Sequence, residues 1–290
     1  MARKAVAKRR ERRASVRVAR LPTTMPAASG PITVRHYCQG IGDCHLLRFP
    51  RADGGDFWML IDCGLHSSVK GGPGTIARIV ADIAERTGRI DVVVVTHEHW
   101  DHVVDLREVA DRYGVPIVAS QKTADLVDFK VDEIVGDGDE TVSGGLTIKW
   151  IATPGHSDGH MALLINGTDV ITADVIFKGT VGGTVAPGET GFPELKSSIM
   201  DRLMTLPPET RIHPGHREPS TVGEEWENNP FIRVWRGLDE EGSEPCEVNN
   251  FGSATLVLWA PDYDGTNKAW IRLPDGEDKI TGGSQILSRG

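Results

Sequence analysis

Three histidines and one aspartate fall within a stretch of six residues, at His97, His99, Asp101 and His102. They directly follow an apolar run, residues 91–96, that is typical of a buried strand. Neutral imidazole nitrogens and carboxylate oxygens are ligands for zinc, iron and manganese. A lone histidine on an apolar face is usually a core residue, but four potential ligands in a loop after a strand predict a metal site.

Further candidate ligands follow other apolar runs of the chain, and these are Asp62, His156, Asp174 and His216. By count, two sites of three ligands can be assembled: His97, His99 and His156 for one metal, and Asp101, His102 and His216 for the other. Asp174 has two carboxylate oxygens and could bridge the two metals. Each metal would then have four protein ligands and open positions for water.

The elements that must position these residues begin with three predicted strands, at 32–37, 45–49 and 57–61, separated by glycine-containing turns. This pattern predicts an antiparallel meander whose third strand ends at Asp62. A helix is predicted at 74–86 from the spacing of its isoleucines, and strand 91–95 then leads into the histidine cluster. The first half ends with a helix at 104–113, a short strand at 117–119, a short helix at 122–126 and a short strand at 133–135.

The second half repeats this alternation of strands and polar loops. Strands are predicted at 146–151, 161–165 and 169–172, the last two joined by the favoured turn Asn166-Gly167. A glycine-rich loop at 179–191 precedes a helix at 193–206, a short strand at 211–213 and a further helix at 222–227. Two strand-rich halves, each with helices, predict two sheets packed face to face with the helices outside.

Composition and net charge indicate which classes of protein this chain can belong to. The 290 residues are 39% hydrophobic and 25% charged, which allows a sizeable core, and no apolar run reaches the length of a membrane span. Residues 1–30 hold nine lysines and arginines and one acid, Glu11, so they carry +8, whereas the whole chain carries −9. The acidic remainder argues against binding of nucleic acid by the folded part.

The basic arm and the linker rich in Pro, Ala and Thr that follows it, residues 1–31, are expected to be disordered. The arm could contact nucleic acid or an anionic surface, or act as an organelle-targeting segment, because it is rich in arginine. The cysteines have no CxxC spacing, which favours a reducing environment. We therefore expect a cytoplasmic location, with organelle targeting through the arm as the alternative.

Five ordered motifs resemble those of the metallo-β-lactamase superfamily: Leu60–Gly64, Thr96–His102, Thr153–His156, Thr172–Asp174 and Ile212–His216. The resemblance covers roughly residues 32–230. It implies an α/β fold, namely an αβ/βα four-layer sandwich of two mixed sheets with outer helices. It also implies that the metals lie at one edge, between the sheets.

Within that superfamily, residues 174–179, 193–199 and 213–231 resemble glyoxalase II, the hydroxyacylglutathione hydrolases. Asp174 stands where true lactamases often have a cysteine, and His99 stands where the flavo-diiron branch has a glutamate. Only 42 positions separate Asp174 from His216, too few for the inserted domain of the nuclease branch.

The resemblance implies a metal-dependent hydrolase with two Zn²⁺ per chain, in which a metal-bound hydroxide cleaves a thioester or related ester; iron or manganese could replace zinc. Asp62 is expected to orient a ligand or water, and Asp101 to act as ligand and proton acceptor. One alternative is a mononuclear iron persulfide dioxygenase, a branch that residues 153–159 also resemble. The other is a lactone hydrolase, although such enzymes often use a tyrosine shortly after the bridging aspartate, where this chain has Phe177 and no tyrosine before Tyr263.

Three segments are therefore predicted: the arm and linker at 1–31, a metallo-β-lactamase-like domain at 32–232, and a C-terminal β-hairpin extension at 233–290. The hairpin is predicted from the strand-like runs 254–259 and 268–273, and packing against the domain is its default role. The expected partner is a small thioester or ester, with no membrane, and with nucleic acid only through the arm. The oligomeric state is left open, with a dimer as one option.

Overall fold

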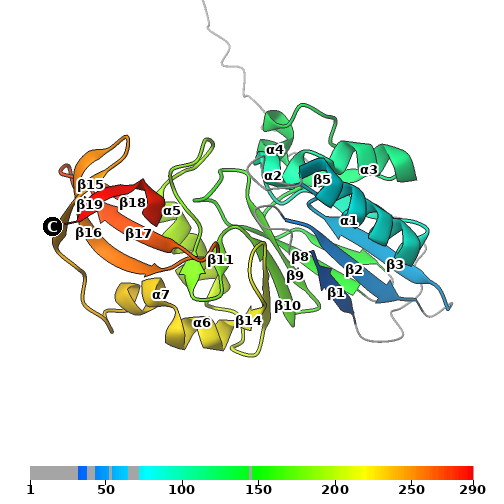
Figure 1. Cartoon of the computed structure of the whole chain (residues 1–290). Coiled ribbons are helices and arrows are strands. Elements are labelled where there is room, and N and C mark those ends of the chain that lie inside the picture. The colour runs from blue at the N-terminus through cyan, green and yellow to red at the C-terminus, as the bar shows by residue number, and fades with distance from the viewer. Residues whose placement is uncertain (1–31, 38–42, 52–53, 65–71, 144–145, 290) are drawn as a thin grey trace, which may run out of the picture.

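Two six-stranded sheets, a five-stranded C-terminal sheet and a small two-stranded sheet form the framework of the molecule in the computed structural model (Figure 1). The structure describes residues 32–37, 43–51, 54–64, 72–143 and 146–289. The arm and linker predicted at 1–31 lie outside these residues. No helix among the described residues is long and apolar enough to cross a membrane.

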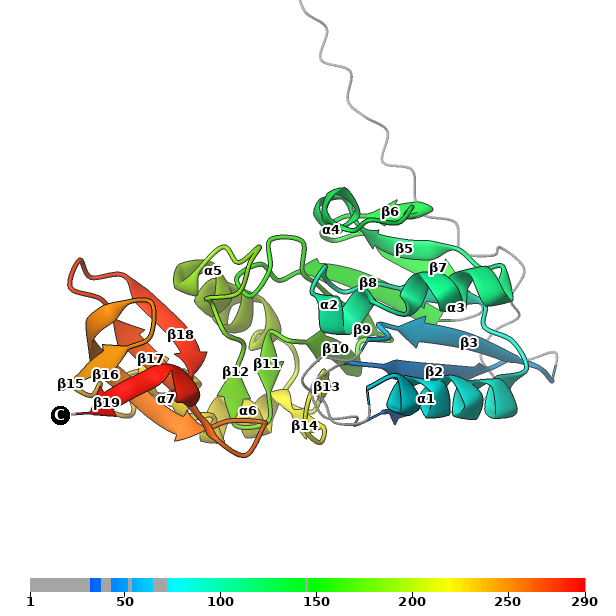
Figure 2. The same cartoon turned by 45° about the horizontal axis from the view of Figure 1, so that its top comes forward.

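The first sheet has the order β1-β2-β3-β4-β5-β6. Its strands are β1 (Thr33–His36), β2 (His45–Pro50), β3 (Asp56–Ile61), β4 (Val92–Val94), β5 (Ile117–Ser120) and β6 (Glu133–Val135). The predicted antiparallel meander is present in β1 to β3, and β3 to β6 are parallel. Helices α1 (Gly72–Thr87) and α3 (Leu106–Tyr113) lie on one face of this sheet (Figure 2), where Ile79, Ile83 and Leu106 join a buried apolar cluster. The short helix α4 (Gln121–Leu126) connects β5 to β6.

The second sheet has the order β14-β13-β10-β9-β8-β7. Its strands are β7 (Glu140–Ser143), β8 (Leu146–Ala152), β9 (Met161–Ile165), β10 (Asp169–Ala173), β13 (Arg211–Pro214) and β14 (Ser220–Thr221). Only β10 and β13 pair in parallel. Helices α5 (Phe192–Ser197), α6 (Val222–Asn228) and α7 (Pro230–Trp235) contribute Leu195, Val222 and Phe231 to the buried cluster on its outer face.

A third apolar cluster lies between the two sheets. Met59 and Val92 of the first sheet belong to it together with Trp150 and Leu163 of the second, and all four are at most 1% exposed. Apolar residues on both faces of each sheet bury it from two sides, which produces the layers helix, sheet, sheet, helix. This confirms the predicted αβ/βα sandwich of two mixed sheets.

The predicted helix at 104–113 is wrong at its start, because the helical region is split into α2 (Trp100–Val103) and α3. Two backbone groups explain the break. The amide of Asp105 donates to the carbonyl of Cys63, and the carbonyl of Asp101 accepts from the amide of Asp43. Since both groups bond to the loops around β2 and β3, they are not available for a continuous helical ladder.

Two further predictions need correction, and two strands were missed. The helix predicted at 193–206 is α-helical only in α5 and continues as a π-helix over Ser198–Leu203. The start of the predicted glycine-rich loop belongs to a hairpin of β11 (Ile176–Phe177) and β12 (Thr180–Val181). Strand β7 and the short β14 were not predicted. All of these are short elements, for which sequence periodicity is weak.

The C-terminal region is more than the predicted hairpin. The hairpin exists as β16 (Gly252–Pro261) and β17 (Asn267–Arg272), but it is the centre of a sheet with the order β18-β17-β16-β15-β19. The additional strands are β15 (Glu244–Val248), β18 (Asp278–Gly282) and β19 (Ile286–Arg289). Val257, Trp270 and Ile280 of this sheet lie in the same apolar cluster as α5 and α7, so the sheet packs directly on the sandwich.

Candidate metal centre

Five strand ends deliver the predicted site residues to one edge of the sandwich. Asp62 follows β3, His97 follows β4, His156 follows β8, Asp174 follows β10 and His216 follows β13. Strands β3 and β4 are parallel, β10 and β13 are parallel, and β8 runs in the same direction as β10 because both are antiparallel to β9. Within each sheet, the carboxyl ends of these strands therefore lie at the same edge.

Strained backbone surrounds the site. Asp62, Ala173 and Arg217 have φ values of 52°, 38° and 72°, in the left-handed region that residues other than glycine rarely adopt. Each lies at or just after the end of a strand, and each is a predicted site residue or the neighbour of one. Such strain persists only where the surrounding structure enforces it, and it is typical of functional sites.

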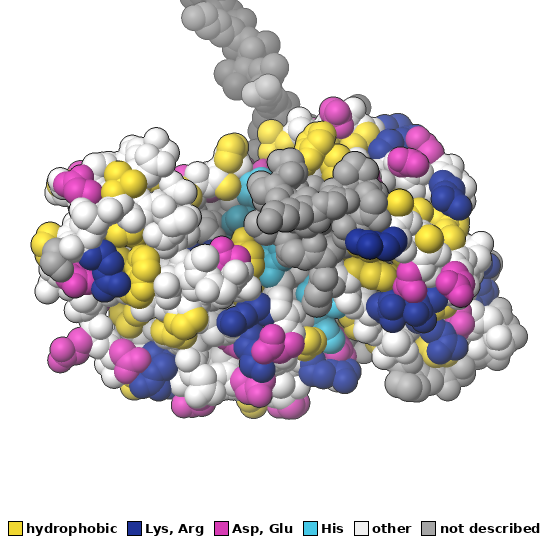
Figure 3. All heavy atoms as spheres, viewed as in Figure 1, with side chains coloured by type: hydrophobic (Ala, Val, Ile, Leu, Met, Phe, Trp, Pro, Cys, Tyr) yellow, Lys and Arg dark blue, Asp and Glu magenta, His cyan; other side chains and the backbone are white. Residues whose placement is uncertain are grey.

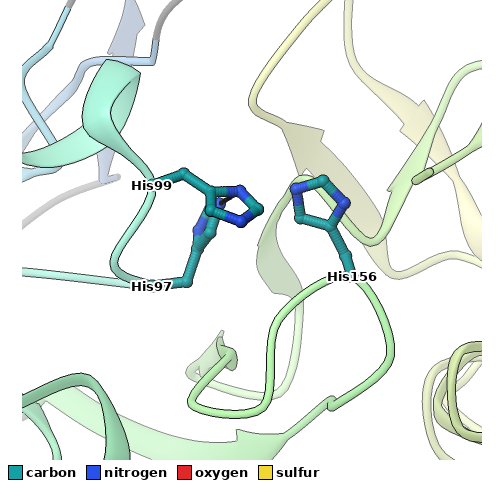
Figure 4. Close-up of side chains that lie close together, drawn as sticks. All are labelled: His97, His99 and His156. Carbon is teal, nitrogen blue, oxygen red and sulfur yellow. Dashed lines mark hydrogen bonds between the residues drawn. The ribbon is translucent and has the colours of Figure 1, made fainter. Parts of the chain in front are cut away.

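The first predicted group converges as expected. His97, His99 and His156 offer ligand nitrogens that all lie within 4.8 Å of one another, and their rings face a common space (Figure 4). His97 and His99 come from the loop after β4, and His156 comes from the loop after β8.

Hydrogen bonds fix which nitrogen of each ring carries the proton. His99 Nε2 lies 2.9 Å from the carbonyl of Pro187, and His156 Nδ1 lies 2.9 Å from the carbonyl of Gly183. Since carbonyls only accept, these nitrogens donate, and His99 Nδ1 and His156 Nε2 are left with lone pairs. His97 Nδ1 is 3.0 Å from the Thr96 hydroxyl, whose own proton goes to Asp62 at 2.6 Å.

His97 Nδ1 therefore donates to that hydroxyl, and its Nε2 also presents a lone pair. That atom lies 3.1 Å from His99 Nδ1. Two lone pairs at this separation repel each other unless a cation lies between them or one ring takes up a second proton. Three imidazole lone pairs directed to one point form a ligand set suited to zinc or iron.

The second predicted group also converges. The ligand atoms of Asp101, His102 and His216 lie within 4.8 Å of one another. Asp62 Oδ2 accepts from His102 Nδ1 at 2.9 Å, so the other nitrogen of His102 faces the site as an acceptor. A carboxylate behind a histidine in this way fixes the ring orientation and increases the basicity of the ligand nitrogen.

Asp174 lies between the two groups. Its carboxylate oxygens are 3.3 Å from His102 Nε2, 3.7 Å from His156 Nε2 and 3.6 Å from His216 Nε2. The same three nitrogens and Asp174 Oδ1 are buried without a hydrogen-bond partner. Buried polar atoms are rarely left unpaired, so four of them around one space fit a bound divalent metal, and Asp174 lies where the predicted bridge between two ions would be. Histidine side chains show at the surface in the furrow between the C-terminal sheet and the first sheet (Figure 3).

The pKa values of His97, His156 and Asp174 are shifted in the direction that favours metal binding. Burial, with the charges of neighbouring histidines, holds the pKa of His97 well below its ordinary value. Burial also lowers the pKa of His156 to about 4. Burial alone would raise the pKa of Asp174, but His216 and His102 hold it well below its ordinary value. Neutral imidazoles and an ionised carboxylate are the forms in which these groups coordinate metal.

The pKa values of His102 and His216 are shifted in the opposite direction in the absence of a metal. Burial would lower the pKa values of His102 and His216, yet the charge of Asp174 raises both above the ordinary value. A cation bound here would replace these protons, so metal binding is expected to release protons to solvent.

All the residues predicted for the site come together in the structure: His97, His99, Asp101, His102, His156, Asp174 and His216 around one space, with Asp62 behind His102. Their roles as ligands stay a prediction.

A second buried polar cluster, His36, Asp43 and His45, lies directly behind the site and was not predicted. His36 Nε2 is 2.8 Å from the carbonyl of Gly215, the residue before His216. The rings of His36 and His45 stack at 4.3 Å with only 13° between their planes. Because imidazole lone pairs lie in the ring plane, nearly parallel rings cannot aim them at one ion. We interpret this cluster as a support for the loop that carries His216.

Tyr263 is the other residue that sequence reasoning missed. It lies between β16 and β17 of the C-terminal sheet, yet its ring stacks on His216 at 4.3 Å with 19° between the planes. Its contact depends on how the C-terminal sheet packs on the sandwich, and no local motif signals that packing.

Comparisons with known proteins agree with this geometry. A family model described as the metallo-beta-lactamase superfamily matches residues 39–216, more than half of the chain. A probable metallo-hydrolase, YqgX of Bacillus subtilis, is 31% identical over 160 residues, which cover 48% of this chain and 74% of the relative. A hydroxyacylglutathione hydrolase of Chromohalobacter salexigens is 27% identical over 246 residues, covering 70% of this chain and 92% of the relative.

Two solved structures are also similar. The structure of ETHE1 from Myxococcus xanthus has a TM-score of 0.56 and 26% identity, and the match covers 71% of this chain and 91% of that one. The structure of TTHA1623 in a di-iron-bound form has a TM-score of 0.51 and 25% identity, and the match covers 72% of this chain and all of that one.

Proposed function

The chain belongs to the metallo-β-lactamase superfamily, a metallo-hydrolase superfamily, and we propose that it hydrolyses a thioester or a related ester with two divalent metal ions. The observation that carries the proposal is the set of unpartnered, buried ligand atoms around Asp174. Two ions held there would lower the pKa of a bound water and polarise a substrate carbonyl.

The residues of the chain have distinct tasks in this proposal. His97, His99 and His156 would hold one ion, and Asp101, His102 and His216 the other, with Asp174 between them. Asp62 keeps His102 in the tautomer that presents Nε2 to the site. Asp101 is half-buried beside His102 and His216, and in this proposal it takes a proton from the attacking water. Zinc and iron both suit these ligands.

A thioester is favoured as the substrate on two grounds. The hydroxyacylglutathione hydrolase relative matches along 92% of its own length, so the similarity extends through the whole of that enzyme's catalytic region or most of it. In addition, a thiolate leaves without help from a strong acid. In this proposal the histidines and carboxylates of the site bind metal or one another instead of protonating a leaving group as it departs.

A persulfide dioxygenase with a single iron is the second candidate. The similarity to the ETHE1 structure, at 26% identity, favours it, and the same histidine and aspartate ligands could hold one iron. The two candidates differ in metal count and in oxygen consumption, so they can be separated directly.

The test is a substrate panel on the purified, metal-loaded protein. We would measure hydrolysis of a hydroxyacyl thioester of glutathione, of 4-nitrophenyl acetate and of a lactone, and oxygen uptake with glutathione persulfide. Thioester hydrolysis that is lost in His97→Ala and kept in Asp132→Ala, a variant of an exposed aspartate away from the site, supports the proposal. Oxygen uptake on the persulfide without hydrolysis would overturn it.

A further inference from the structure

The C-terminal sheet reaches the metal centre through the turn between β16 and β17. Tyr263 in this turn stacks on His216, and its ring also lies 5.0 Å from that of Phe177, which follows Asp174 closely in sequence. Near-parallel stacking at 4.3 Å places the phenol ring flat against a predicted metal ligand.

The turn that carries Tyr263 is held in place. Asp262 and Lys268 form an ion pair of 2.9 Å, and both side chains are at most 6% exposed. Lys268 Nζ also lies 5.0 Å from the centre of the Tyr263 ring, within the range of a cation–π contact. Asp262 Oδ1 further accepts from the backbone amide of Tyr263 at 2.7 Å. A buried pair with these additional contacts restrains the tyrosine to one place.

The same sheet supports the other side of the centre. In β18, the amide of Ile280 donates to the Thr184 hydroxyl at 2.9 Å, and the Ile280 carbonyl accepts from the Thr184 amide at 2.8 Å. Thr184 follows Gly183, whose carbonyl fixes the tautomer of His156. The C-terminal sheet thus supports one predicted ligand from each metal group. It contacts His216 directly, and it reaches His156 through Thr184 and Gly183.

The Tyr263 ring lies against His216 and Phe177, at the border of the reaction space. The ring is half-buried, and its hydroxyl forms no hydrogen bond with the residues that the structure describes. After burial, the charge of Asp174 is the largest cause that raises the pKa of this tyrosine, and the charge of Asp101 adds to it. Beside a predicted metal ligand, the phenol thus has a hydroxyl that no described residue uses.

We propose that the C-terminal sheet completes the active site and that Tyr263 is a catalytic residue whose hydroxyl donates a hydrogen bond to the substrate carbonyl oxygen. The proposal rests on the hydrolase function proposed above. As water adds to the carbonyl carbon, negative charge grows on that oxygen, and a donor placed in advance stabilises it. The carbonyl then re-forms as the bond from carbon to the leaving sulfur or oxygen breaks, the departed leaving group takes the proton that Asp101 accepted from the water, and Tyr263 keeps its own proton throughout.

The experiment compares Tyr263→Phe with Tyr263→Ala in the cobalt-substituted holoenzyme. Tyr263→Phe keeps the ring and removes only the hydroxyl. We expect unchanged cobalt content and visible absorption spectrum, but a fall of about 10- to 100-fold in kcat with little change in KM, because the bond strengthens in the transition state. Tyr263→Ala should also lose the ring support and bind cobalt more weakly. Tyr113→Phe, in a half-buried tyrosine on α3, is the control and should match the wild type.

A second measurement does not depend on turnover. Acetate offers a carboxylate oxygen in place of the substrate carbonyl, and its binding can be followed by the cobalt spectrum. Loss of one hydrogen bond to this charged oxygen should weaken acetate binding in Tyr263→Phe by about 10- to 100-fold. If the wild type hydrolyses no substrate, the hydrolase proposal fails while this titration still decides the role of Tyr263.

Wild-type kinetics and wild-type acetate affinity in Tyr263→Phe would overturn the proposal and leave Tyr263 as a structural support. Loss of cobalt from Tyr263→Phe would also overturn it, because the hydroxyl would then act on the metal site itself. Absence of acetate binding to the wild-type protein would count against it in the same way.

Discussion

Asp62 is held by three hydrogen bonds behind the predicted metal site. Its two oxygens accept from the Thr96 amide at 2.9 Å, from the Thr96 hydroxyl at 2.6 Å and from His102 Nδ1 at 2.9 Å. It is fully buried and has a left-handed backbone. Because both oxygens already accept hydrogen bonds, we assign Asp62 the task of orienting His102 and, through Thr96, His97.

Asp62→Asn should therefore weaken metal binding without removing a ligand. The amide group has one acceptor and one donor end, so it must oppose either the Thr96 amide or the His102 proton with another donor. We expect metal affinity to fall by about 10- to 100-fold, measured by competition with a chelator. Asp132→Asn is the control, and equal affinities in the wild type and Asp62→Asn would show that Asp62 does not orient the ligands.

The lowered pKa of His36 predicts how the stability of the metal-free protein depends on pH. Burial and the neighbouring His45 lower the pKa of His36 to about 4 in the folded protein, against an ordinary value of 6.5. Below pH 6.5 the unfolded chain takes up a proton that the folded chain does not, so the contribution of His36 to stability is lost as the pH falls. In metal-free protein this amounts to about 2 kcal/mol between pH 8 and pH 5.

His36→Gln removes the titrating group and keeps a donor for the Gly215 carbonyl. Urea unfolding should show that the variant loses about 2 kcal/mol less than the wild type over this pH range. Measurement at pH 8, where His36 is neutral in both states, corrects for any other effect of the substitution. Parallel pH curves for the two proteins would contradict the assignment.

At the scale of elements, the close contact between the loop after β3 and α2 sets the distance between the predicted ligands. A Cβ atom at Gly64 would lie 2.4 Å from the carbonyl of Asp101 and 2.8 Å from the amide of His102. Both neighbours are backbone atoms, so they cannot move aside as a flexible side chain can. Only glycine allows α2 to approach β3 closely enough for Asp62 to reach His102.

Gly64→Ala should displace α2, destabilise the fold by about 1–3 kcal/mol and weaken binding of the metal assigned to Asp101, His102 and His216. Gly136→Ala is the matched control, because its new Cβ would meet nothing closer than 3.5 Å. Urea unfolding and metal content would be compared for the two variants. A Gly64→Ala protein with full metal content and stability would show that this contact is not required.

The elements that the sequence predicted well are those with strong apolar runs. The valines of β4 and the alternating apolar residues of β2 and β3 are buried, and their ends place Asp62 and His97 as expected. The break between α2 and α3 was not predictable, since it depends on hydrogen bonds to Cys63 and Asp43 in the loops around β2 and β3. The polar, half-exposed β15 has too little apolar pattern to be predicted as a strand.

At the scale of the whole molecule, the site is formed by residues from both sheets of the sandwich and is flanked by the C-terminal sheet. The ordered motifs were enough to assemble the ligands, because strand direction brings strand ends together whatever the loop lengths are. They could not show that residues 233–290 reach the centre. That contact follows from the packing of Trp270 and Ile280 against α5 and α7, which depends on the shapes of distant surfaces.

The central claim, a pair of metal ions bridged by Asp174, is tested most directly by metal content. Elemental analysis of the purified wild-type protein and of Asp174→Ala should be joined to the hydrolysis assay, with Asp132→Ala as the control. We predict two divalent ions per chain in the wild type and the control, and loss of metal and hydrolysis together in Asp174→Ala. A single iron per chain in the wild type, or full turnover by metal-loaded Asp174→Ala, would contradict the bridged pair.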